Sequence, residues 1–118
     1  MKNLAPDIPR QRVLIEGFYK ITVNESVIRE YFRQLAATLD LTIYGDPIIF
    51  SPSGLGSEEN QGYDAFIPLI DSGISLYIWA NRQFLSIILY TCKSFATETA
   101  IQFTQDFFQI PDCEHQAF

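Results

Sequence analysis

The amino-acid sequence predicts an α+β fold, a two-layer sandwich in which an antiparallel sheet carries two helices on one face. Three observations predict this class. A strand-like run at 13–21 leads into a helical pattern, further strand-like runs gather between residues 41 and 92, and a second helical pattern follows at 97–108. Strands grouped between two helices are typical of antiparallel sheets whose helices lie on one side.

The length of 118 residues suits one domain with a modest core. We expect a loose N-terminal arm at 1–12, which holds two prolines, and a single domain at 13–118. Apolar residues make up 47% of the chain and charged residues 19%, which is a composition of folded rather than disordered proteins.

The net charge of −6 argues against a nucleic-acid partner or an anionic membrane surface, because both select basic patches. The sequence contains no apolar run of membrane-spanning length and no signal-peptide pattern, so we expect a cytoplasmic protein. Two cysteines are too few for a disulfide scaffold, and no Cys/His spacing fits a metal site.

The first strand is expected at 13–21, where β-branched and aromatic residues mix. Thr22 followed by Glu25 fits a capping box and predicts the start of a helix. The apolar stripe of this helix has helical spacing and consists of Ile28, Tyr31, Phe32, Leu35 and Leu39.

The later elements are a strand at 41–50, a loop at 51–62, strands at 63–70, 72–79 and 84–92 with a hairpin turn at 80–83, and the helix at 97–108. Gly45-Asp46-Pro47 is expected to break or bulge the strand at 41–50, because proline cannot donate to a sheet. The helix at 97–108 is expected to bury Ala100, Ile101, Thr104, Phe107 and Phe108. The tail at 110–118 shows no pattern.

The strands between 72 and 92 are apolar on both faces, although the two helices can cover only one face of the sheet. A large uncovered apolar face is typical of an interface. We therefore expect a second copy of the chain to cover the other face, which makes the protein a homodimer.

Three segments of the sequence carry a family resemblance. They are F-S-P-S-G at 50–54, D-S-G-I-S-L-Y-I-W at 71–79 and Y-T-C at 90–92. They resemble the small bacterial S-adenosylmethionine decarboxylases, whose pattern is F-x-P-x-G, then E-S-H-x-(S/T)-x-H-T-W-P-E, then F-T-C. The pattern fits without a gap from Gly62 to Cys92, and Ile15-Glu16-Gly17 further resembles the F-E-G of eukaryotic members. The resemblance covers about residues 13–109.

The resemblance implies a role for Ser72. Enzymes of this family make their own cofactor: the serine hydroxyl attacks the preceding carbonyl, here that of Asp71, the chain breaks, and the serine remnant becomes a pyruvoyl group. That ketone serves as the electron sink for decarboxylation. Gly73 suits the tight turn that this chemistry needs. In the family a histidine, here replaced by Tyr77, drives the cleavage, and a cysteine, here Cys92, donates a proton.

The resemblance also implies a substrate site for S-adenosylmethionine. Phe50 matches an aromatic residue that stacks on adenine, and Asn81 stands where the family has a glutamate that holds the ribose. Trp79 falls on the family tryptophan and is a candidate for a stacking wall. Glu16 is expected to face the sulfonium of the substrate. Further departures are aspartate for glutamate before the serine and glycine for histidine after it.

Each of these residues also has an ordinary structural interpretation. Ser72 alone fits a turn serine, and Cys92 fits a small buried side chain. Phe50, Tyr77 and Trp79 fit core positions, and Glu16 fits an outward position on a strand.

Several functions remain open for the whole chain. The first is a pyruvoyl lyase acting on S-adenosylmethionine for polyamine synthesis, or on arginine or ornithine. The second is an uncleaved S-adenosylmethionine-binding protein that promotes alkylation or elimination at the sulfonium, or acts as a regulatory subunit. The third is a dimerising domain without catalysis.

Overall fold

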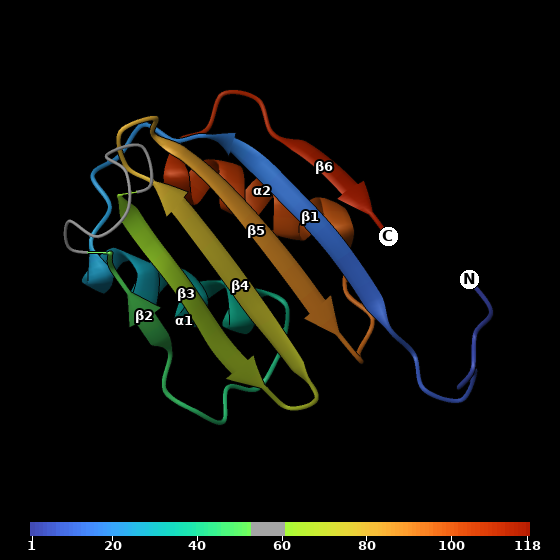
Figure 1. Cartoon of the computed structure of the whole chain (residues 1–118). Coiled ribbons are helices and arrows are strands. Elements are labelled where there is room, and N and C mark those ends of the chain that lie inside the picture. Colours follow the sequence, from blue (N-terminus) through green and yellow to red (C-terminus); the bar gives the residue numbers. More distant parts are fainter. Residues whose placement is uncertain (53–60) are drawn as a thin grey trace.

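The computed structural model describes residues 1–52 and 61–118 of the chain, which form one sheet backed by two helices (Figure 1). The elements in chain order are β1 (Gln11–Phe18), α1 (Glu25–Thr38), β2 (Ile48–Phe50), β3 (Gly62–Leu69), β4 (Ser72–Trp79), β5 (Phe84–Thr91), α2 (Thr97–Phe108) and β6 (Glu114–Ala117). Neither helix of the described parts is long and apolar enough to cross a membrane.

The six strands lie in the order β2-β3-β4-β5-β1-β6, and each neighbouring pair is antiparallel. Both helices lie against one face of this sheet (Figure 1). The predicted α+β class and two-layer arrangement are therefore confirmed.

The core lies between the helices and the covered face of the sheet. Alternate strand residues point into it, among them Ile15, Ile74, Leu76, Ile87 and Leu89, which are at most 1% exposed. The predicted α1 stripe is buried as expected. In the second helix Ala100, Thr104 and Phe108 are fully buried, while Ile101 and Phe107 are partly buried against the core.

A buried hydrogen bond links the two helices. The hydroxyl groups of Tyr31 on α1 and Thr104 on α2 lie 2.8 Å apart, and both residues are 0% exposed. The Thr104 hydroxyl also donates to the carbonyl of Ala100 at 2.8 Å. Burial raises the pKa of the Tyr31 phenol well above its ordinary value.

The predicted start of α1 is wrong. The capping residue is Asn24, whose side-chain oxygen accepts from the backbone N–H of Val27 at 2.9 Å. Glu25 is consequently the first helical residue and cannot occupy the third position that a capping box with Thr22 requires.

The predicted strand at 41–50 is too long. Only Ile48–Phe50 pairs continuously with β3, and Ile43 makes one isolated bridge with Leu69. The segment around Pro47 separates the two, as the proline predicts. Most of the predicted loop, at 53–60, lies outside the described residues.

Both ends of the domain differ from expectation. β1 begins at Gln11, so residues 11–12 of the predicted arm belong to the sheet, and it ends at Phe18 rather than at residue 21. The tail forms β6, which pairs with β1 at the edge of the sheet. Its four residues are all exposed, so the sequence contains no apolar periodicity from which this strand could be predicted.

The second face of the sheet, which we call the open face, is covered by no described element. It presents several large side chains, among them Phe18, Phe50, Phe66, Tyr77 and Tyr90, which are 37–66% exposed. This face carries part of the candidate site described below, including the hollow beside Gly73.

Substitution of Thr104 tests the link between the helices. We expect Thr104→Val to lower the free energy of unfolding by about 1–3 kcal/mol, because the buried Tyr31 hydroxyl loses its partner. Tyr31→Phe leaves the Thr104 hydroxyl bonded to Ala100 and should cost less, about 1 kcal/mol. Urea unfolding of both variants measures the difference, and a larger loss for Tyr31→Phe would contradict this account.

Candidate active site

The predicted serine and cysteine lie side by side at one end of the sheet, where β4 begins and β5 ends. Ser72 opens β4, and Cys92 directly follows the last residue of β5. Because β4 and β5 are antiparallel neighbours, the start of one lies beside the end of the other. The sheet therefore brings together two residues that are twenty positions apart in the chain.

Two hydrogen bonds join the members of this pair to each other, and a third connects the pair to the turn before Ser72. The backbone N–H of Cys92 donates to Ser72 Oγ at 3.1 Å, and the Ser72 hydroxyl is directed to Cys92 Sγ at 3.8 Å. The Cys92 thiol in turn lies 3.8 Å from the carbonyl oxygen of Ile70. The serine hydroxyl is thus held in a fixed place by the cysteine.

The residue before the serine has a strained backbone. Asp71 lies in the β3–β4 turn with φ of 52°, in the left-handed region that aspartate and asparagine adopt more often than other non-glycine residues and that Asp40, Gln83 and Gln109 also adopt. Such strain is of the order of 1–3 kcal/mol and clusters at functional sites. Asp71 is also the residue whose carbonyl carbon the Ser72 hydroxyl would attack in the predicted cleavage.

Two hollows flank Ser72. One of about 320 Å³ opens on the open face, where Phe66, Asp71, Gly73 and Tyr90 are among the residues that line it together with Ser72. The other, of about 240 Å³, lies between the Ser72–Cys92 pair and the segment after α1.

Lys93 and Asp40 close the second hollow. Lys93 Nζ donates to the carbonyl oxygen of Asp40 at 2.8 Å and to Asp40 Oδ2 at 3.0 Å. Ser72 is therefore reachable from two sides, and Cys92 lines only the second hollow.

Gly73 has a packing reason in this chain. A Cβ placed on Gly73 would lie 2.5 Å from Cε2 of Phe66, so the Phe66 ring occupies the space that a side chain at 73 would need. Phe66 lies one strand away on β3. A histidine at this position would require the ring to move.

The predicted residues Glu16, Tyr77 and Phe50 lie in one row across the open face. Strand pairing sets Glu16 opposite Ser86, Ser86 opposite Tyr77, Tyr77 opposite Asp64, and Asp64 opposite Phe50. Ser86 donates to Glu16 Oε2 at 2.8 Å, which fixes the half-buried carboxylate on this face.

Trp79 and Asn81 lie at the end of β4 opposite to Ser72. The ring centroid of Phe84 is 5.4 Å from that of Trp79 and 5.3 Å from that of Phe18. These three rings and Arg82 surround a hollow of about 260 Å³. Asn81 lies in the exposed β4–β5 turn beside it.

The predicted site residues thus form two groups rather than one. Asp71, Ser72 and Cys92 are together, whereas Tyr77 is five residues further along β4, about 16 Å at the rise of an extended strand. The second group contains Tyr77 and the other predicted substrate-binding residues, which are Glu16, Phe50, Trp79 and Asn81. The motif residues Ser53 and Gly54 lie outside the described residues.

Sequence reasoning missed Phe66, Tyr90, Lys93 and Asp40. Phe66 and Tyr90 reach the serine only through cross-strand pairing, and Asp40 reaches it through the chain after α1. Tyr90 belongs to the Y-T-C motif at 90–92 and Lys93 follows the predicted cysteine directly, so sequence adjacency was the signal available for these two residues. In the described residues, no group of three or more His, Cys, Asp or Glu side chains is arranged to hold a metal ion.

The family profile of S-adenosylmethionine decarboxylase matches residues 15–118. The chain belongs to the S-adenosylmethionine decarboxylase family.

The fold is similar to the crystal structure of the adenosylmethionine decarboxylase from Aquifex aeolicus VF5, with a TM-score of 0.73 and 14% sequence identity. The match covers 94% of this chain and 89% of the other. No curated protein matches the sequence significantly. Membership of the S-adenosylmethionine decarboxylase family confirms the resemblance drawn from Ser72, Trp79 and Cys92.

The second cysteine offers a test of burial near β6. Burial, with a smaller effect of the Asp112 carboxylate, raises the pKa of the Cys113 thiol to about 11. In a Cys92→Ser variant, where Cys113 is the only thiol, we expect alkylation by iodoacetamide to be slow at neutral pH. Its rate should keep rising about tenfold per pH unit up to pH 9.5, because only the thiolate reacts.

The urea-unfolded variant is the control, since its thiol has an ordinary pKa of about 8.5. Its rate should level off above that value. A rate that levels off between pH 8 and 9 in the folded variant would contradict the burial of Cys113.

Proposed function

We propose that the protein is a lyase of the S-adenosylmethionine decarboxylase type that cleaves itself between Asp71 and Ser72 and carries a pyruvoyl group at position 72. One observation supports this above all. The hydroxyl of Ser72 is held by Cys92 next to a left-handed Asp71, in a chain of this family.

The proposed self-cleavage uses one water and releases one ammonia. Ser72 Oγ attacks the carbonyl carbon of Asp71, the peptide C–N bond breaks, and an ester with a free amine results. Loss of the Ser72 α-proton then expels Oγ as part of the Asp71 carboxylate. Water replaces the nitrogen of the remaining imine, ammonia leaves, and position 72 becomes a ketone.

The residues around Ser72 fit such a group. A pyruvoyl group, when present, would supply the electron sink for loss of carbon dioxide. The hollow on the open face gives a substrate amine access to position 72. Cys92 Sγ, within 4 Å of Ser72 Oγ, is placed to donate the proton that replaces the lost carboxylate.

The second group of residues fits the remainder of the substrate. Glu16, fixed by Ser86, supplies a negative charge for a sulfonium, and the acidic chain favours a cationic ligand. Trp79 and its ring neighbours offer stacking for a nucleobase, and so does Phe50. Asn81 can hydrogen-bond ribose hydroxyls.

The separation of the two groups supports a homodimer. A single copy places Tyr77 about 16 Å along β4 from Ser72, too far for proton transfer. If a second copy covers the open face in the opposite direction, the Tyr77 end of one chain meets the Ser72 end of the other. The half-exposed aromatic side chains of this face are the surface that such an interface would bury.

A second candidate function keeps the pocket without self-cleavage. The only histidine of the chain, His115, lies on β6, three strands from β4. Phe66 occupies the space beside position 73, where a histidine is typical of the family. An uncleaved chain would bind S-adenosylmethionine and act on its sulfonium by orientation, or serve as a regulatory subunit.

The intact mass of freshly purified protein under denaturing conditions distinguishes these two functions. Self-cleavage predicts two fragments, 1–71 and 72–118. The second fragment should be lighter by one ammonia than a fragment with an N-terminal serine. The Ser72→Ala variant is the matched control and should remain one chain. A single full-length mass for the wild type would reject the pyruvoyl mechanism and favour the uncleaved function.

Co-expression of two variants tests whether Tyr77 acts across the dimer. We expect Tyr77→Phe alone to cleave about a hundredfold more slowly, the loss typical of a general acid or base. In mixed dimers with uncleavable Ser72→Ala chains, the Tyr77→Phe chain should cleave at a near wild-type rate, because its Ser72 receives Tyr77 from the partner. Wild-type cleavage by Tyr77→Phe alone, or no rescue in the mixture, would exclude this role.

A further inference from the structure

The chain leaves the sheet directly before the proposed proton donor, Cys92. β5 ends at Thr91, the backbone bends at the cysteine, and α2 begins at Thr97. We call residues 92–96 the bend segment. Its path decides where the Cys92 N–H and thiol lie relative to Ser72, because the strand pairing of β5 stops at Thr91.

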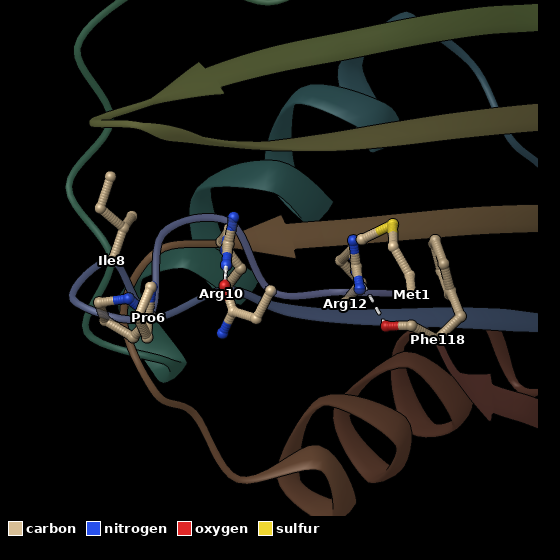
Figure 2. A pocket seen from close by; sticks show the side chains of 8 residues that line it. Met1, Pro6, Ile8, Arg10, Arg12 and Phe118 are labelled. Atoms are coloured by element: carbon tan, nitrogen blue, oxygen red, sulfur yellow. Dashed lines mark hydrogen bonds between the residues drawn. The ribbon is translucent and has the colours of Figure 1, made fainter.

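Gln11, the first residue of β1, lies beside this exit from the sheet. Strand pairing sets Gln11 opposite Thr91. Residues two apart in a strand share a face, and Val13 is fully buried in the core, so the Gln11 side chain is on the face that the helices cover. Its chain neighbours Arg10 and Arg12 line a separate hollow beside the N-terminal arm, and Gln11 does not (Figure 2).

The carboxamide of Gln11 forms three hydrogen bonds where the bend segment meets α2. Its Nε2 donates to the carbonyl oxygen of Phe95 at 2.9 Å, and its Oε1 accepts from the Phe95 N–H at 3.1 Å. Nε2 also donates to Oγ1 of Thr97 at 3.2 Å. One side chain thus satisfies both backbone groups of Phe95 and holds the start of α2, whose N-terminal residue Ala96 makes no side-chain cap.

The start of the bend segment is held by the strand that precedes it. Thr91 is fully buried, and its hydroxyl donates to the carbonyl oxygen of Lys93 at 2.7 Å. Between these two residues, the Cys92 N–H donates to Ser72 Oγ at 3.1 Å. The bend segment is therefore fixed at its start by Thr91 and at its end by Gln11, so the geometry of the serine and the cysteine depends on a residue of a third strand.

We propose that Gln11 is a positioning residue for the Ser72–Cys92 pair. Without its carboxamide, the N–H and carbonyl groups of Phe95 lose their partners, and the bend segment can adopt other conformations. The Cys92 N–H then no longer holds Ser72 Oγ in one place, and the thiol is no longer kept 3.8 Å from it. Gln11 precedes the family match at 15–118, so family membership does not supply this role. The effect on cleavage rests on the proposed function, whereas the effect on the bend segment does not.

The rate of self-cleavage tests the role of Gln11 in the proposed reaction. Each variant is made by short cell-free synthesis, and the appearance of the two fragments is followed by mass. We expect Gln11→Ala to cleave about tenfold more slowly than the wild type, on the order of the loss of one or two hydrogen bonds. Tyr31→Phe loses a buried hydrogen bond between the helices, so it is the matched control for reduced stability and should cleave as the wild type does.

Gln11→Glu distinguishes positioning from a general loss of packing. A protonated glutamate has a donor and an acceptor, as the carboxamide does, whereas a carboxylate only accepts and leaves the Phe95 carbonyl without a donor. The ratio of the Gln11→Glu rate to the wild-type rate should therefore rise toward one as the pH falls through the glutamate pKa, ordinarily about 4.3. Gln11→Ala should show no such rise. A ratio for Gln11→Glu that does not change with pH would contradict the proposal.

Alkylation of Cys92 tests the bend segment whether or not the chain cleaves. In a Ser72→Ala, Cys113→Ala background no chain can cleave at Ser72, and Cys92 is the only thiol. Cys92 is half-buried, so a looser bend segment exposes it. We expect Gln11→Ala to react with iodoacetamide about tenfold faster than this background, and Tyr31→Phe to react as the background does.

The two measurements separate this proposal from the proposed function. Equal alkylation rates with and without the Gln11 side chain would overturn the positioning role. An unchanged cleavage rate in Gln11→Ala, beside a wild type that cleaves, would also overturn it. A wild type that remains one chain would reject self-cleavage alone, and alkylation would then decide the role of Gln11. Circular dichroism checks that each variant is folded.

Discussion

The antiparallel register between β4 and β5 is the constraint on which the rest of the site depends. It sets Gly73 opposite Tyr90 and Tyr77 opposite Ser86, so the first residue of one strand lies beside the residue that ends the other. The hydrogen bond from the Cys92 backbone to Ser72 Oγ follows from this register. A slip by one residue would turn Ser75 and Tyr77 into the core and Ile74 and Leu76 to the open face, which burial forbids.

This explains how much of the fold could be predicted. Each of β4, β5 and the two helices buries one face, so the spacing of their apolar residues can be recognised in the sequence. Their bounds were predicted to within one residue, apart from the start of α1. β6 has no buried side chain, and only pairing with β1 defines it. The choice of Asn24 over Thr22 as the cap depends on where the backbone turns into the helix, and both residue types cap well.

The candidate site likewise contains residues that the sequence could predict and residues that it could not. Ser72 and Cys92 could be found because the motif spacing already contains the length of the β4–β5 hairpin. Phe66 and Lys93 could not, because their places depend on the packing of β3 and on the segment after α1. The assignment of Tyr77 and Asn81 to one catalytic centre with Ser72 rested on the family pattern. That pattern does not show that an extended strand carries residues five or more positions apart far from one another.

The candidate residues lie at two opposite ends of the sheet, and this separation affects how substitutions at the two ends combine. Ser72, Gly73 and Phe66 lie at one end, and Trp79, Asn81 and Phe84 lie at the other. Substitutions more than 7–10 Å apart act almost independently on stability, so changes at the two ends should have nearly additive effects on the free energy of unfolding. In a homodimer every site would join one end from each copy, because neither end alone holds both a nucleophile and a nucleoside-sized aromatic wall. The interface of the proposed dimer would then contribute to the chemistry as well as to stability.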